Sequence, residues 1–155
     1  MITNRDLYFA CIYSGLNSRY LSESEWKNWA DLLLELSLVP KKWVIELANF
    51  SFYNENKLNE ELFNEMHLNS TSNEMLFQCL HEMIFSFVYI KSFLNGGGDE
   101  NEFLNALEEM GFSEGMSFNE IKKLASKNLD VCLNFSNSMN DVDFLRKNKW
   151  IYEQN

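Results

Sequence analysis

The chain has 155 residues, of which 46% are hydrophobic and 15% aromatic, a composition typical of a folded domain with a packed core. Its length fits one domain, so we expect residues 1–155 to form a single unit. Asp and Glu number 23 against 13 for Lys and Arg, a net charge of −10 that makes the molecule repel polyanions. Composition therefore excludes a disordered chain and argues against binding to nucleic acid.

The cysteine content and the apolar runs indicate a reduced, cytoplasmic protein without a membrane segment. Cys11, Cys79 and Cys132 are an odd number in widely separated contexts, so we expect buried free thiols instead of a disulfide framework. No apolar run of signal-peptide length stands at the start of the chain. The longest strongly apolar stretch without a charge, 83–90, is far shorter than the ~20 residues that a membrane span needs.

Apolar residues spaced three and four apart predict helices along the whole chain. In chain order, these apolar segments cover 7–12, 26–36, 43–48, 58–66, 75–93, 103–110, 118–133 and 142–150. Four of the helices have a capping-box pattern at their start, in which an acceptor side chain precedes a glutamate by three residues. The four pairs are Ser22 with Glu25, Thr71 with Glu74, Asp99 with Glu102, and Ser117 with Glu120.

Several helix boundaries follow from the positions of glycine and proline. The first helix should stop near Gly15, and Pro40 should occupy the first position of the third helix. Residues 72–94 are apolar on nearly every side, which is typical of a buried central helix, and the glycine run 96–98 should end it at a flexible point. The pattern predicts an all-α, single-domain helical bundle or orthogonal array of about six to eight helices.

The negative charge is concentrated in the middle of the chain. Residues 51–120 hold thirteen acids against two lysines, a balance of −11, whereas the flanking segments are nearly neutral. That excess is larger than the magnitude of ~2–8 that keeps a small domain soluble. We therefore expect the acidic middle to contact a basic partner. The residues predicted to bind this partner are Glu60, Glu61, Glu65, Asp99, Glu100 and Glu102.

Local motifs offer no catalytic residue, metal site or cofactor site. His81-Glu82 matches the start of a zinc-protease helix, but Phe85 stands where the second histidine is required. Cys79 lies two residues from His81 on one helix, so the two side chains diverge and cannot form a local pair of nucleophile and base. An enzyme whose site is assembled from distant Cys, His and carboxylate residues stays open as an alternative.

The stretch 13–49, with Gly15-Leu16 and the segments 22–30 and 43–48, is similar to helical segments of small bacterial families encoded beside toxin genes. A small, acidic, all-helical protein of this kind resembles the immunity proteins of contact-dependent growth inhibition and related polymorphic toxin systems. The resemblance implies an inhibitor that binds a cognate toxin domain, often a nuclease, and blocks its active site or substrate surface.

A nuclease presents Lys and Arg to phosphates, and an acidic helical surface suits the same site. The resemblance covers about a quarter of the chain and assigns no individual functional residue. Besides the enzyme named above, a helical subunit of a larger assembly is the other open alternative.

Overall fold

The computed structural model describes residues 2–67, 73–112 and 115–154, and within these ranges it contains nine α-helices and no strand. The helices are α1 (Asn4–Asn17), α2 (Glu23–Leu36), α3 (Lys42–Ala48), α4 (Asn56–His67), α5 (Asn73–Tyr89), α6 (Glu100–Glu109), α7 (Phe118–Ser126), α8 (Leu129–Ser138) and α9 (Val142–Lys147). A π-helical turn, η1 (Ile90–Leu94), continues α5, and a 3₁₀ turn, η2 (Lys149–Ile151), follows α9. The all-α class predicted from the sequence is confirmed.

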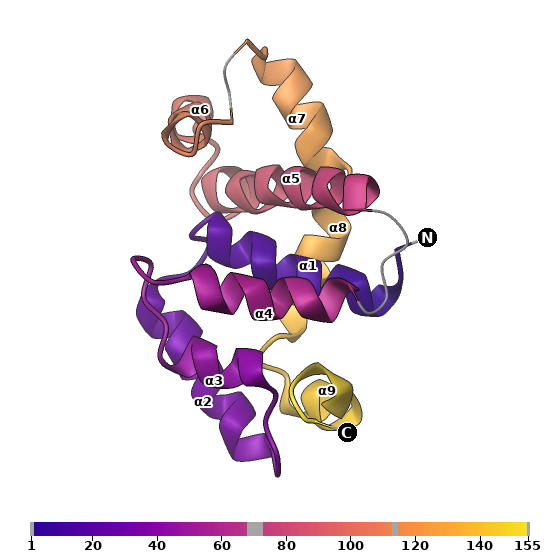
Figure 1. The fold of residues 1–155 in the computed structure, drawn as a ribbon. Helices are drawn as coiled ribbons and strands as arrows, with labels where there is room; N and C mark the ends of the chain where they lie inside the picture. The colour runs from indigo at the N-terminus through magenta and orange to yellow at the C-terminus, as the bar shows by residue number, and fades with distance from the viewer. Residues whose placement is uncertain (1, 68–72, 113–114, 155) are drawn as a thin grey trace.

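The helices form an array in which α1 lies between α4 and α5 across the middle of the molecule (Figure 1). Helices α2, α3 and α9 lie at one end, and α6 and α7 lie at the other (Figure 1). Helix α8 runs along the back and packs on both α1 and α5. The acidic middle of the sequence, 51–120, is thereby divided between α4 on one side of α1 and α5 to α7 on the other.

Two of the four predicted capping boxes are present in the structure, at the starts of α2 and α7. Ser22 accepts the amide of Glu25 and the carboxylate of Glu25 accepts the amide of Ser22, both at 3.2 Å. Ser117 and Glu120 repeat this reciprocal pair at the start of α7. Each box satisfies two amides that the helix itself leaves without an acceptor.

The other helix starts differ from the expectation. Asp99 caps α6 by accepting the amides of Asn101 and Glu102, without a bond back from the Glu102 side chain. Thr71 lies outside the described residues. A further capping box, Thr3 with Asp6, begins α1. The sequence pattern requires a glutamate three residues after the capping residue, so it misses this box, which has an aspartate there.

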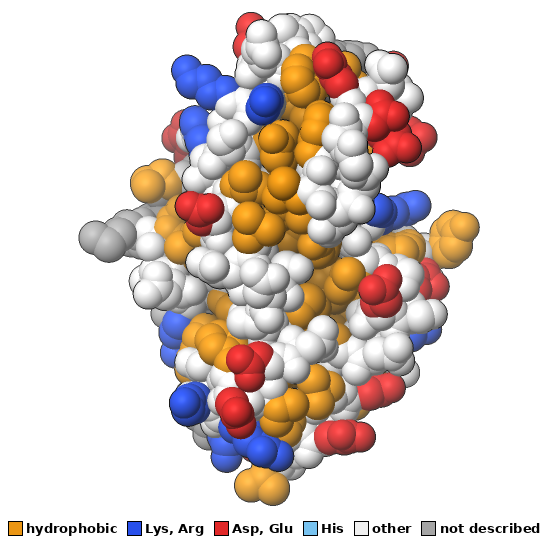
Figure 2. All heavy atoms as spheres, turned by 180° about the vertical axis from the view of Figure 1, so that it is seen from behind, with side chains coloured by type: hydrophobic (Ala, Val, Ile, Leu, Met, Phe, Trp, Pro, Cys, Tyr) orange, Lys and Arg blue, Asp and Glu red, His pale blue; other side chains and the backbone are white. Residues whose placement is uncertain are grey.

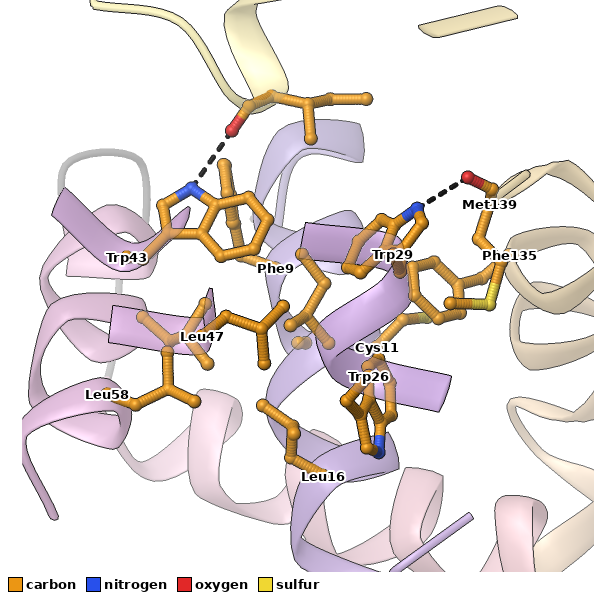
Figure 3. Close-up of a cluster of buried hydrophobic side chains, with 14 of the residues drawn as sticks. Phe9, Cys11, Leu16, Trp26, Trp29, Trp43, Leu47, Leu58, Phe135 and Met139 are labelled. Carbon is orange, nitrogen blue, oxygen red and sulfur yellow. Dashed lines mark hydrogen bonds between the residues drawn. The ribbon is translucent and has the colours of Figure 1, made fainter. Parts of the chain in front are cut away.

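Two hydrophobic cores share helix α5. The larger core is built around Trp26, Trp29, Trp43 and Phe9 (Figure 3). It also includes Leu76, Leu80 and Phe87 of α5. The smaller core joins α5 to α6 and α7 through Ile84, Phe85, Val88, Phe103, Leu107, Ile121 and Ala125. Because α5 packs on both cores, it is buried on most sides, as its apolar sequence predicts.

Two indole groups tie the α2–α3 hairpin to the C-terminal part of the chain (Figure 3). The Trp29 Nε1–H donates to the backbone carbonyl of Met139 at 2.6 Å, and the Trp43 Nε1–H donates to the carbonyl of Ile151 at 3.0 Å. A buried indole brings a large apolar surface and one donor that needs an acceptor. Both requirements are met by segments more than 100 residues further along the chain.

The structure refines one predicted helix boundary and corrects another. The first helix ends at Asn17, near the predicted position, and Gly15 lies inside it with the ring of Trp26 in the space where a side chain would be. Pro40 precedes α3 instead of starting it, and it forms an isolated bridge with Glu153.

The segment 118–133 is two helices, not one, with Lys127 and Asn128 between α7 and α8. Their side chains reach across to Glu82 on α5, with Nζ and Nδ2 at 3.2 and 3.3 Å from its carboxylate. The break therefore places two donors on a buried acceptor. At the end of α5, Gly97 and Gly98 have φ of +91° and +85°, a backbone region that favours glycine.

Candidate functional site

The six predicted partner-binding residues belong to two separate helices. Glu60, Glu61 and Glu65 lie on α4, which packs against α1 and α3, whereas Asp99, Glu100 and Glu102 begin α6, which packs against α5 and η1. Helices α1 and α5 lie between these groups (Figure 1). The structure therefore does not bring the six carboxylates together on one surface.

Lysines of the chain itself balance much of the charge on α4. The Lys41 Nζ lies 3.0 Å from the Glu65 carboxylate, and these two side chains are only 12% and 18% exposed. Glu61 lines a shallow depression together with Lys41 and Lys42. Glu60 alone of the three predicted residues on this helix is exposed. Helix α4 thus offers little free negative charge to a partner.

Helix α6 carries an acidic face that the chain does not neutralise. This surface, called here the α6 acidic face, consists of Asp99, Glu100 and Glu102 at the start of the helix and Glu108 and Glu109 in its last turn. All five side chains are exposed, and none forms an ion pair within the described part of the chain. Between these two acidic groups, Phe103 and Leu107 are buried in the smaller core and attach α6 to the rest of the domain.

The α6 acidic face ends at a cavity of about 520 Å³, called here the α1–α5–α6 cavity. Its walls come from the C-terminal end of α1, the residue before α4, the middle of α5 and the C-terminal end of α6. The polar lining residues are Tyr13, Asn17, Arg19, Glu55, His81 and Glu109, and the apolar ones are Leu16, Phe77, Leu80, Ile84, Met110 and Phe112. Glu109 belongs both to the acidic face and to the cavity.

Glu55 is a partly buried carboxylate without a cation bound to it. It forms no ion pair and its carboxylate accepts no hydrogen bond within the described residues. Burial raises the pKa of Glu55 above its ordinary value, and the charge of Arg19 offsets only part of this effect. Burial also raises the pKa of the Tyr13 phenol, and the Glu55 carboxylate adds to that shift.

The cavity contains titratable groups, but they are not arranged as catalytic pairs. No two of Tyr13, Arg19, Glu55, His81 and Glu109 form a hydrogen bond or ion pair with each other. Arg19 instead stacks its guanidinium over Phe52, 4.9 Å from the ring centre, and the His81 ring meets the Phe112 ring edge-on at 5.2 Å. A nucleophile and its base need direct contact, which this arrangement does not supply.

One exposed apolar side chain lines the cavity, and a second is exposed elsewhere on the same helix. Phe77, a cavity residue, is 51% exposed, and Met75 on the same helix is 50% exposed. The ring of Phe77 stacks on that of Phe63 with centroids 5.6 Å apart. Exposed aromatic groups next to a hollow are typical of the centre of a protein interface.

The cavity residues escape sequence reasoning because they come from segments as far apart as Tyr13 and Phe112. Local spacing carries no signal for such a site. Glu108 and Glu109 belong to the acidic stretch 51–120 but lie outside the six predicted residues; their place on the same helix as Glu102 is the signal that points to them.

Other features that bear on function are reactive cysteines, metal-binding groups and membrane-spanning helices. All three cysteines are free and buried, as predicted. No group of three or more His, Cys, Asp or Glu side chains in the described ranges is placed to hold a metal ion. Among the same residues, no helix has both the length and the apolar character needed to cross a membrane. Comparisons with protein-family models, curated proteins and solved structures find no match to this chain.

Proposed function

We propose that this protein is an immunity protein that acts in the cytoplasm by binding and blocking a basic, nuclease-type toxin domain. The observation that carries the proposal is the α6 acidic face, with five exposed carboxylates and no cation to neutralise them among the described residues. A surface of this kind attracts a basic partner and raises the rate at which the two proteins meet.

The acidic residues at the two ends of α6 differ in how strongly they support partner binding. Asp99, Glu100 and Glu102 lie at the start of the helix, where acidic side chains cap the amides and interact favourably with the helix dipole. Glu108 and Glu109 lie in the last turn, where the dipole makes a negative charge unfavourable. Helix stability therefore accounts for the first group but not for the second, which makes Glu108 and Glu109 the stronger support for partner binding.

The alternative of a helical subunit in a larger assembly also has an observation in its favour. Seen from behind, a band of hydrophobic side chains runs down the upper half of the molecule (Figure 2). Contiguous exposed apolar surface is typical of sites where proteins associate. Binding through this band instead of α6 would not depend on the α6 carboxylates.

Charge reversal on α6 tests the proposal against a matched control. The test variant is Glu108→Lys with Glu109→Lys, and the control is Asp31→Lys with Glu35→Lys on the exposed side of α2. Both variants change the net charge by the same amount. The partner to be tested is a basic toxin domain, sought among the products of the genes next to this one, and the readouts are cell growth on production of that domain and the association rate at low and high salt.

We expect the α6 variant to lose protection and to associate about tenfold more slowly at low salt, with a weaker salt dependence. The control should protect as the original chain does. Equal protection and equal association rates for the two variants would contradict the proposed role of α6. The same contradiction would follow if the original chain failed to bind the domain at all.

A further inference from the structure

We infer that the α1–α5–α6 cavity receives a lysine or arginine side chain of the partner that binds the α6 acidic face. This inference rests on the proposed function and assigns the cavity a role within it. Two carboxylates from separate segments, Glu55 before α4 and Glu109 at the end of α6, line the same cavity. Its position at the end of the acidic face places it where a basic partner lying along α6 arrives.

The negative charge at Glu55 is free to act on a ligand. Among the described residues, Arg19 is the one Lys or Arg that lines the cavity, yet it makes no ion pair with Glu55 and stacks on Phe52 instead. The carboxylate is partly withdrawn from water, and the nearby charge of Arg19 offsets only part of the cost because no ion pair forms between the two groups. A cation entering the cavity would supply that ion pair.

The remaining walls suit the rest of a long basic side chain. Tyr13, Phe77 and Phe112 line the cavity with aromatic rings, a type of group that attracts cations, and Leu80 and Ile84 line it with apolar surface that suits an aliphatic stem. A volume of about 520 Å³ is within the roughly 300–1,000 Å³ of ordinary ligand pockets. The cavity therefore has room for one basic side chain together with part of the segment that carries it.

A short peptide tests the cavity without the natural partner. The probe is acetyl-Leu-Arg-Leu-amide, and its control replaces arginine by citrulline, which keeps the shape and removes the charge. Binding is followed by the shifts of backbone amide signals in nuclear magnetic resonance spectra of the full chain. We expect the arginine peptide to shift the signals of His81, Ile84 and Phe112, and to bind at least fivefold more tightly than the citrulline peptide.

Two isosteric variants test whether the Glu55 carboxylate is the charge that binds the arginine peptide. Glu55→Gln should weaken binding of the arginine peptide about three- to tenfold, the range for a charged contact that is only partly shielded from solvent. Glu60→Gln, an exposed position five residues further along and outside the cavity, should leave binding unchanged. Equal binding of the two peptides, or equal affinity of the two variants, would overturn the inference.

The two proposals fail in different ways. If Glu108→Lys with Glu109→Lys abolishes protection while Glu55→Gln leaves partner dissociation unchanged, the proposed function stands and the cavity has no role in it. If Glu55→Gln accelerates dissociation of the partner without slowing association, the cavity holds a buried contact, because contacts of that kind govern the dissociation rate.

Discussion

The six-membered ring of Trp26 occupies the space that a side chain at Gly15 would need. A Cβ atom at Gly15 would lie 3.2 Å from both Cη2 and Cζ2 of this ring. Gly15 is inside helix α1, and Trp26 on α2 has no exposed surface. The glycine therefore serves packing between two helices instead of ending the first one.

Replacing Gly15 should destabilise the protein in proportion to the size of the new side chain. We expect Gly15→Leu to lower the free energy of unfolding by about 1–3 kcal/mol through overpacking. Gly15→Ala should change it much less, because a gain in helix propensity of up to ~1 kcal/mol opposes the tight contact. Urea unfolding of both variants checks this expectation.

The Trp26→Phe background gives the control, since phenylalanine is smaller than the indole. The loss caused by Gly15→Leu should be smaller in that background, which shows as coupling in a double-mutant cycle. Independent, additive effects of the two substitutions would contradict the proposed contact.

Gly15 also illustrates what the sequence could and could not predict. The period of apolar residues and the capping side chains identify the helices because both signals lie within a few residues of each other. The role of Gly15 depends on Trp26, eleven residues away, and the break between α7 and α8 coincides with contacts to Glu82 on α5. Boundaries decided by distant neighbours are therefore missed.

The same distinction applies to the candidate site. The acidic start of α6 was predicted because its charges are adjacent in the sequence. The pairing of Glu65 with Lys41 spans 24 residues, so the sequence did not reveal that α4 is partly neutralised. The α1–α5–α6 cavity is assembled from four segments and leaves no local pattern.

Glu82 should be a major polar contributor to the attachment of α7 and α8 to α5. Its carboxylate receives Lys127 Nζ at 3.2 Å, Asn128 Nδ2 at 3.3 Å and Gln78 Nε2 at 3.2 Å, and its side chain is 10% exposed. Lys127→Ala would leave a nearly buried carboxylate without its cation. We expect it to lower the free energy of unfolding by about 1–2 kcal/mol, a range that allows for the partial exposure of Lys127.

Lys123→Ala is the matched control, because Lys123 is exposed one turn earlier on α7 and forms no ion pair in the described part of the chain. It should change stability by less than about 0.5 kcal/mol. Chemical unfolding with equal losses for the two lysines would show that the contact with Glu82 contributes nothing to stability.

Glu55 should destabilise the free protein at neutral pH. Burial raises its pKa in the folded state above the ordinary value of 4.5, so folding disfavours the charged form. The cost is present above the folded pKa and is absent below the unfolded pKa, where the group is protonated in both states. Glu55→Gln should therefore be more stable than the original chain at pH 7, with the difference closing as the pH falls toward 4.

Urea unfolding at pH 7 and pH 4 measures this difference, with the exposed Glu60→Gln as a control that should show neither effect. A Glu55→Gln variant that is less stable at pH 7 would mean that the carboxylate already has a favourable partner in the folded chain. Such a result would also remove the basis for placing a cation in the cavity.

The three cysteines should be unreactive in the folded protein. Burial raises the pKa of the Cys79 thiol to about 11, and the neighbouring Cys132 thiol together with burial raises the pKa of Cys11. Because the thiolate is the reactive form, a pKa near 11 leaves roughly one thiol in ten thousand ionised at pH 7. Iodoacetamide should label almost none of the native protein and all three residues in urea.

The pattern of labelling also decides between binding and one form of catalysis. An enzyme built on a distant cysteine requires at least one thiol that is accessible and easily ionised, and such a residue would be alkylated quickly and selectively in the native state. Mass spectrometry of native protein after brief treatment identifies it. Fast modification of Cys79, which lies two residues from His81, would favour the enzymatic alternative, whereas uniform protection leaves the α6 acidic face as the main candidate for function.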